Sequence, residues 1–195
     1  MADMSSLAFH FRFDKALQAA GMFLQLNGGR MEYLKLLKLL YLADRECLAI
    51  EGDTITGDSV RAMRKGPVLF TVYNLIKDRD SQSPRWHRYI KNGGNHSVYI
   101  AESPGTLDLY RLEKDIIKRL DVQHKDKDGF DLVALTHTFP EWKKYEVRLN
   151  TPGQRKSCWI SIEDILEGLE KKYLLEQVQG SVSAERFHRN LHHYQ

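Results

Sequence analysis

Histidine and acidic residues are the first candidates for chemistry in this sequence, and their spacing decides which reactions they could support. His188 and His192 are four positions apart, so on a helix they would face the same side, as two metal ligands do. Zinc needs a third or fourth ligand, and no cysteine cluster or suitably spaced acidic residue lies near this pair. We therefore expect a solvated basic terminal helix, with a metal site as the lesser alternative, and we predict neither a metal nor a cofactor.

A second group of candidates could act in acid–base catalysis. Asp126 and Asp128 could form a carboxylate pair, but they lie among charged and polar residues, where nothing would separate their two pKa values. His137 could be a general base, yet no serine, cysteine or carboxylate lies at a telling distance from it. We interpret the aspartates as part of a solvated loop. His137 is better explained as a structural histidine, hydrogen-bonded near a helix end.

The sequence carries no recognised catalytic motif. Glycine-rich phosphate loops, the G-x-S-x-G elbow of hydrolases and the H-E-x-x-H metal motif are all absent. The segments Asn27-Gly28-Gly29 and Asn92-Gly93-Gly94-Asn95 are better explained as turns, because glycine and asparagine tolerate positive φ. These observations predict a protein that is not an enzyme.

Nucleic-acid binding has only weak support. Basic and aromatic residues alternate from Arg85 to Tyr89, but on a strand they would divide between two faces. Lys and Arg number 29 against 26 Asp and Glu, for a formal charge of +3 over 195 residues, which is too even for binding through charge alone. We therefore consider a nucleic-acid partner unlikely.

The element that must organise the fold is an apolar segment from Tyr33 to Glu51. Leucines, tyrosines and alanine leave it almost no polar face, which predicts a central helix covered on several sides. Lys35 and Lys38 interrupt this pattern. A buried lysine is costly without a partner, so we expect at least one of them to reach the surface or to meet a carboxylate such as Asp44 or Glu32.

The remaining pattern predicts further helices and one hairpin. Apolar spacing indicates a helix over Phe13–Asn27, and the flanks of the Asn92–Asn95 turn, Arg85–Ile90 and His96–Glu102, indicate paired strands. Lys143–Ile160 is expected to be an ordered loop. The other predicted helices are Val68–Lys77 with Pro67 in its first turn, Leu107–Val122, Asp128–Leu135, Ile162–Leu175 and a short one over Ala184–Leu191.

These elements define the expected architecture. We predict an α+β, predominantly α-helical fold: a single compact helical domain over residues 1–195 with one small β-hairpin. Its core would span about 13–175, and 176–195 would be a C-terminal tail or short helix. No apolar run is long enough to span a membrane and no secretion signal is visible, while Cys47 and Cys158 form no framework. We therefore expect a cytoplasmic protein with reduced thiols.

Three motifs occur in the order and spacing of a known family. They are the run Lys35–Asp44, the Arg64-Lys65-Gly66-Pro67-Val68 turn followed by Val72-Tyr73, and the segment Leu135–Trp142. Together they resemble the Panacea domain, the family of SocA-like antitoxins once known as phage-associated proteins. The resemblance covers roughly Phe13 to Ile165. It departs from the family pattern at Arg64-Lys65, where many relatives carry Trp or Tyr, and at Phe139-Pro140.

The resemblance implies a function in protein binding. Family members are non-enzymatic antitoxins that bind a cognate protein toxin, commonly encoded next door, and block it. Some relatives instead act as adaptors that deliver the toxin to an ATP-dependent protease. Because family motifs that are distant in sequence should be neighbours in space, we expect a toxin-binding surface formed by Lys38, Tyr41, Asp44, Arg64, Gly66, Pro67, Thr136, His137 and Trp142.

Two functions from other classes compete with this hypothesis. A repressor that binds its own operon would bind upstream DNA with a steep salt dependence. A hydrolase centred on His137 would need a polar pocket with a positioned nucleophile.

Overall fold

The computed structural model describes residues 7–154 and 156–192. Within these residues the helices are α1 (Phe13–Leu26), α2 (Tyr33–Glu51), α3 (Phe70–Ile76), α4 (Ser83–Tyr89), α5 (Arg111–Gln123), α6 (Gly129–His137), α7 (Pro140–Asn150), α8 (Ile162–Gly168), the 3₁₀ turn η1 (Lys172–Leu174) and α9 (Leu175–His192). The strands are β1 (Arg30–Glu32), β2 (Val60–Met63), β3 (Gly66–Leu69), β4 (Ile90–Asn92), β5 (Ser97–Ile100) and β6 (Ser157–Ile160). The predicted α+β, predominantly helical fold is confirmed.

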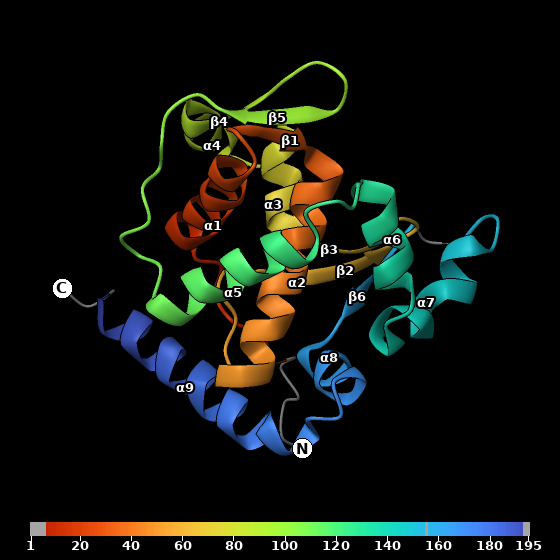
Figure 1. The fold of residues 1–195 in the computed structure, drawn as a ribbon. Coiled ribbons are helices and arrows are strands. Elements are labelled where there is room, and N and C mark those ends of the chain that lie inside the picture. Colours follow the sequence, from red (N-terminus) through yellow and green to blue (C-terminus); the bar gives the residue numbers. More distant parts are fainter. Residues whose placement is uncertain (1–6, 155, 193–195) are drawn as a thin grey trace.

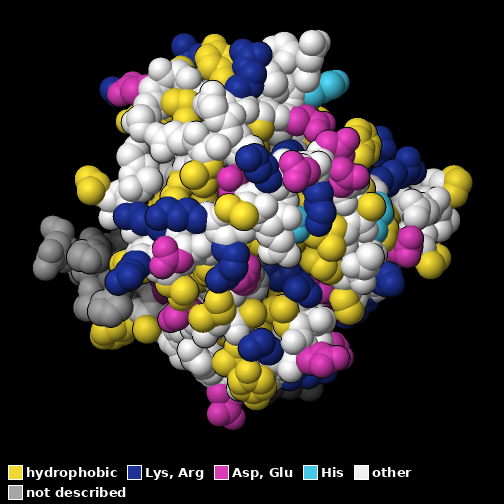
Figure 2. All heavy atoms as spheres, viewed as in Figure 1, with side chains coloured by type: hydrophobic (Ala, Val, Ile, Leu, Met, Phe, Trp, Pro, Cys, Tyr) yellow, Lys and Arg dark blue, Asp and Glu magenta, His cyan; other side chains and the backbone are white. Residues whose placement is uncertain are grey.

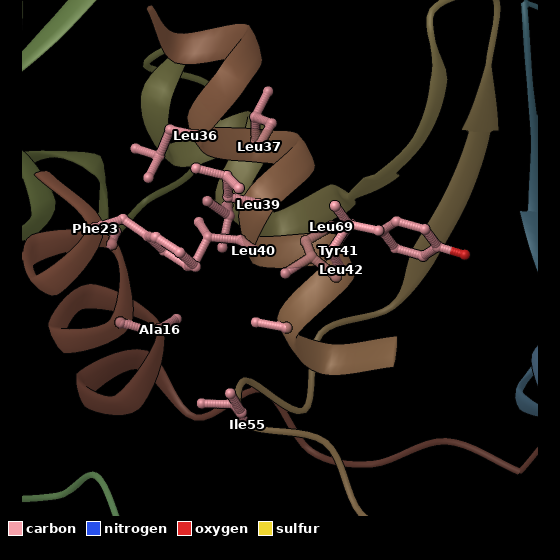
Figure 3. Packing of buried hydrophobic residues seen from close by; sticks show 14 of the residues in the cluster. Ala16, Phe23, Leu36, Leu37, Leu39, Leu40, Tyr41, Leu42, Ile55 and Leu69 are labelled. Carbon is pink, nitrogen blue, oxygen red and sulfur yellow. The ribbon is translucent and has the colours of Figure 1, made fainter. Parts of the chain in front are cut away.

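Helix α2 runs through the middle of the molecule and contacts α1, α5, α6, α8 and β3 (Figure 1). Its leucines are buried on several sides, as the apolar pattern predicts. Leu36 and Leu40 lie opposite Ala16 and Phe23 of α1, with Ile55 below them (Figure 3). Burying each such leucine stabilises the fold by roughly 1.5–3 kcal/mol. This helix is therefore the support on which the other elements are placed.

Two small antiparallel sheets flank the helices, in place of the single predicted hairpin. The strand orders are β1-β5-β4 and β3-β2-β6. The expected hairpin exists as β4 and β5, with Ile90 opposite Ile100. The first sheet adds β1, and the second was missed because its strands are only four residues long. Such strands give too short an alternation to be recognised.

Two local predictions are wrong. Arg85–Ile90 is not a strand apart from Ile90, which begins β4: residues 83–89 form helix α4, with Pro84 in its first turn and Trp86 completely buried. Pro67 does not begin a helix either, because it lies in β3 and α3 starts at Phe70. Since β3 is an edge strand, a residue without an N–H group is tolerated there.

The C-terminal third is more regular than predicted. The expected loop Lys143–Ile160 contains most of α7 and all of β6. The helix predicted over Ile162–Leu175 ends at Gly168. A separate helix, α9, runs from Leu175 to His192, so it starts well before Ala184, where the short terminal helix is expected to begin. Val178 and Val182 of α9 are buried, so this helix is part of the core and not a tail.

Candidate functional site

The motif residues from three parts of the sequence meet beside α2. We call Lys38, Gly66, Pro67, Thr136, His137 and Trp142 the Lys38 cluster. The Lys38 Nζ donates a hydrogen bond to the Pro67 carbonyl oxygen at 2.7 Å. Gly66 has φ +87°, and a Cβ atom there would lie 2.7 Å from both the Lys38 Nζ and the Thr136 Oγ1. The turn can approach the helix this closely only because residue 66 has no side chain.

The ammonium group of Lys38 is unusual because it is fully buried and has no carboxylate partner among the described residues. Burial lowers the pKa of Lys38 from 10.5 to about 7. Lys35 instead donates to the Lys125 carbonyl oxygen at 3.0 Å, near the surface. The expectation that one lysine reaches the surface is therefore met by Lys35, while Lys38 is satisfied by a backbone oxygen.

His137 ends α6 and lies flat against Trp142, with ring centroids 3.6 Å apart and an interplanar angle of 8°. The Trp142 Nε1 donates to the Met63 carbonyl oxygen at 2.9 Å, which fixes the indole over the β2–β3 turn. The buried His137 Nε2 has no hydrogen-bond partner among the described residues. Burial, and next the nearby Lys38 charge, lower the pKa of His137. The ring is thus held by stacking on Trp142 and by a hydrogen bond with the Arg64 backbone.

Tyr41 belongs to a neighbouring network that includes a residue the sequence did not reveal. Its hydroxyl group, which points away from the leucines in Figure 3, donates to the Glu141 Oε1 at 2.7 Å. The Arg45 Nε donates to the same oxygen at 2.6 Å. Burial, and next the negative charge of Glu141, raise the pKa of Tyr41. Glu141 is a buried charge that joins α7 to α2, and only its place beside Trp142 in the third motif could have suggested it.

Asp44 is also buried, and its carboxyl group is hydrogen-bonded within the chain. One oxygen of its carboxyl group accepts hydrogen bonds from the Ile55 and Thr56 N–H groups at 3.0 Å, and the other accepts from the Thr56 hydroxyl. Burial raises the pKa of Asp44 to about 7, against these hydrogen bonds, which favour the carboxylate. Asp44 therefore shapes the loop after α2.

Arg64 is the exception among the predicted contact residues, because its side chain is exposed and its Nε donates to the Leu149 carbonyl oxygen at 3.1 Å. The others are buried apart from His137, which is half-buried. Their neighbourhood confirms that the motifs meet in space. The toxin-binding role of these nine residues stays a prediction. Because most of them are buried, they can affect a partner only by fixing the positions of the surrounding turn and helices.

The structure also bears on metal binding, on the two cysteines and on membrane-spanning helices. Among the described residues, no three His, Cys, Asp or Glu side chains are grouped to hold a metal ion. The side chains of His188 and His192 lie outside the described part. Cys47 and Cys158 are both free thiols. No helix in the described ranges has the length and apolar character that crossing a membrane requires.

One comparison with known proteins gives a match. The family model of the SocA-like antitoxin Panacea domain matches residues 36–143, which is more than half of the chain. This segment begins in α2, ends in α7 and includes the whole Lys38 cluster. No curated protein and no solved structure matches the chain.

Proposed function

Since the chain belongs to the family of SocA-like antitoxins with a Panacea domain, we propose that it neutralises a cognate protein toxin by binding it directly. The observation that carries this proposal is the family match over residues 36–143. The antitoxin role follows from the family, whereas direct binding and the identity of the partner are our inference. We further propose that the protein acts in the cytoplasm and catalyses no reaction.

The arrangement of the α2 motif and the two later motifs suits a binding scaffold. Two of the charged side chains in this region are engaged internally: the Lys38 Nζ with a carbonyl oxygen and the Glu141 carboxylate with Tyr41 and Arg45. These buried interactions fix the relative positions of α2, the β2–β3 turn and α7. A rigid surface of this kind binds a partner with little ordering cost.

The proposal is tested by expressing the product of an adjacent open reading frame alone and together with this chain. We expect growth arrest from the first protein alone, relief on co-expression, and a complex that co-purifies. Relief without co-purification would contradict direct binding, and relief that disappears in a strain lacking its ATP-dependent proteases would indicate an adaptor. If co-expression gives no relief, the antitoxin proposal is wrong.

A further inference from the structure

Two adjoining hollows are lined by residues of β2, β6 and α7, and the larger one also by α2, α8 and residues 7–9. Strand β6 and helices α7 and α8 lie on the side of the molecule away from α1 (Figure 1). Their volumes are about 570 and 480 Å³. Tyr145 and Trp159 line both hollows, so a single extended ligand could occupy the two together. Trp159 is 54% exposed, so its indole is accessible to a ligand, and tryptophan is enriched at protein interfaces.

The larger hollow has mainly apolar walls. Leu48, Val60, Ile160, Ile162 and Ile165 line it. It can therefore receive an apolar side chain, whose burial there would favour binding.

The acidic groups that line this hollow, Asp44, Asp58 and Asp164, are already engaged by hydrogen bonds within the chain. Asp58 accepts hydrogen bonds from the Thr71 and Val72 N–H groups at 3.0 and 2.9 Å. Asp164 accepts from the Lys144 Nζ at 2.6 Å and from the Tyr145 hydroxyl at 2.8 Å. These carboxylates stabilise the walls of the hollow, so the apolar side chains determine that an apolar group binds there.

The smaller hollow is basic. Arg61, Arg148 and Lys156 line it, and none of its lining residues is acidic. Arg148 and Lys156 are exposed, and the structure shows no ion pair for either among the residues it describes. Elsewhere acidic and basic side chains are interspersed, as Figure 2 shows for one face. The local excess of positive charge therefore favours an anionic ligand.

Arg61 is positioned in advance for such a ligand. Its guanidinium carbon lies 3.9 Å from the Phe70 ring centroid and 3.8 Å from that of Trp159, so the group is held between two aromatic rings. One terminal nitrogen donates to the Ser157 Oγ at 3.2 Å, and the structure gives the other terminal nitrogen no hydrogen bond among the described residues. The Nε has no partner there either, but it is buried and out of a ligand's reach. An immobilised guanidinium with unused donors is well suited to bind a carboxylate.

We propose that these hollows, which we call the Trp159 surface, bind a segment of a partner protein in which an apolar side chain is followed by acidic residues. The apolar side chain enters the larger hollow, and the carboxylates meet Arg61, Arg148 and Lys156. This inference rests on the proposed function and assigns the toxin a specific contact surface. Arg148, Lys156 and Trp159 follow the matched segment 36–143, so the family model does not include these three residues.

A polypeptide fits this surface better than a nucleic acid does. Three cations neutralise few phosphates, and the chain as a whole carries a formal charge of only +3. The apolar hollow beside them has no counterpart on a phosphate backbone. A second copy of this chain would bury the same surface and would appear as a dimer.

The test measures fluorescence anisotropy of a short labelled peptide in which leucine and phenylalanine are followed by aspartates and glutamates. The proteins are the full chain, the double variant Arg148→Glu/Lys156→Glu, Trp159→Ala, and the control Lys91→Glu/Lys118→Glu, which has the same net charge as the double variant. Lys91 and Lys118 are exposed on β4 and α5, away from the Trp159 surface. We expect each site variant to bind the peptide about tenfold more weakly, or worse, and the control to bind as the unmodified chain does.

The outcomes separate the competing occupants. The proposal is overturned if the peptide binds the unmodified chain no better than the double variant, including the case of no binding at all. It is also overturned if a single-stranded oligonucleotide binds more tightly than the peptide, or if the unmodified chain forms a dimer that the double variant does not. Circular dichroism and thermal unfolding of each variant verify that the fold is retained.

The co-expression assay separates this inference from the proposed function. If the unmodified chain and the control relieve growth arrest but Arg148→Glu/Lys156→Glu does not, the Trp159 surface is where the toxin binds. If all three relieve arrest equally, the toxin binds elsewhere and the antitoxin role still stands. If the unmodified chain fails, the proposed function is wrong, while the peptide measurement still decides whether the surface binds acidic segments.

Discussion

A buried lysine without a carboxylate partner makes the stability of this protein depend on pH. The pKa of Lys38 is about 7 in the folded chain against an ordinary value of 10.5, because burial disfavours the ammonium form. Between these two values the unfolded chain binds a proton that the folded chain does not. The free energy of unfolding therefore rises with pH across this window, by up to about 1.4 kcal/mol per pH unit. Below pH 7 the folded chain is protonated at Lys38 as well, so the pH dependence ends and the full cost of burying the charge remains.

This dependence should disappear in Lys38→Met, which keeps the length of the side chain but cannot be charged. We expect the unmodified chain to gain stability relative to Lys38→Met as the pH rises from 7 toward 10.5. Urea unfolding of both proteins at several pH values measures the difference, in which the other titrating groups cancel. Two parallel stability curves would show that Lys38 is not neutralised by burial.

Gly66 provides a second test at the residue scale. An alanine there would be strained at φ +87° and would press against the Lys38 Nζ and the Thr136 Oγ1. We expect Gly66→Ala to lower the free energy of unfolding by about 2 kcal/mol or more.

The matched control is Gly105→Ala, where φ is +71° and nothing lies within 4 Å of the added Cβ atom. It should cost only the backbone strain, about 1 kcal/mol. Chemical denaturation of both variants isolates the packing contribution. Equal losses in the two variants would mean that the close approach of the turn to Lys38 does not matter.

At the scale of elements, α3 depends on a cap from a distant segment. Leu69 occupies its N-cap position and has no side-chain oxygen, so the Asp58 carboxylate accepts the Thr71 and Val72 N–H groups instead. In α6 the cap is local and exposed: the carboxylate of the N-cap residue Asp128 accepts hydrogen bonds from the N–H groups of Phe130 and Asp131.

Replacing these two caps should therefore have unequal effects. We expect Asp58→Ala to destabilise the fold by about 2–3 kcal/mol, since it leaves buried N–H groups without a partner. Asp128→Ala should cost about 1 kcal/mol, because water can replace an exposed cap. Thermal unfolding of the two variants checks the order, and a larger loss for Asp128→Ala would contradict it.

The sequence predicts elements well where one strong local pattern decides them. The predicted helix α2 is confirmed, because apolar residues on nearly all sides of this nineteen-residue segment give a strong local pattern. The sequence wrongly predicts a strand over Arg85–Ile90, because this segment flanks the Asn92–Asn95 turn. Residues 83–89 instead form a helix that buries Trp86 in the core. Helix α7 had a usable signal, since Trp142 and Leu149 are seven positions apart and both are buried.

The site was predictable as a neighbourhood but not in its chemistry. Family spacing correctly brings Lys38, Gly66, Thr136 and Trp142 together. No local pattern could show that Lys38 meets a carbonyl oxygen, because that contact depends on the path of the β2–β3 turn. The Trp159 surface depends on residues from β2, α7 and β6, which only the fold brings side by side.

At the scale of the whole molecule, α9 joins the two ends of the described chain. The Glu185 carboxylate accepts from the His10 N–H at 2.9 Å and from Arg12, which also pairs with Asp53. Gln177 donates to the Glu51 carbonyl oxygen at 2.8 Å, at the end of α2 (Figure 1). Since α1 and α9 lie outside the matched segment 36–143, the folded unit is larger than the part the family model describes.

We expect Glu185→Ala to lower the free energy of unfolding by about 1–2 kcal/mol and to speed amide hydrogen exchange in residues 7–12. Glu176→Ala is the control, because Glu176 is exposed on the same helix and the structure gives its side chain no hydrogen bond or ion pair among the described residues. It should leave both properties unchanged. Exchange at residues 7–12 that is the same in both variants would show that α9 does not hold this segment.

The central claim, that this protein acts by binding a toxin directly, is tested most directly by titrating the purified chain into the purified toxin identified by co-expression. The account predicts saturable binding in calorimetry, with toxin activity lost in proportion to the complex formed. Relief of growth arrest in cells by a folded chain that shows no binding in this titration would contradict it.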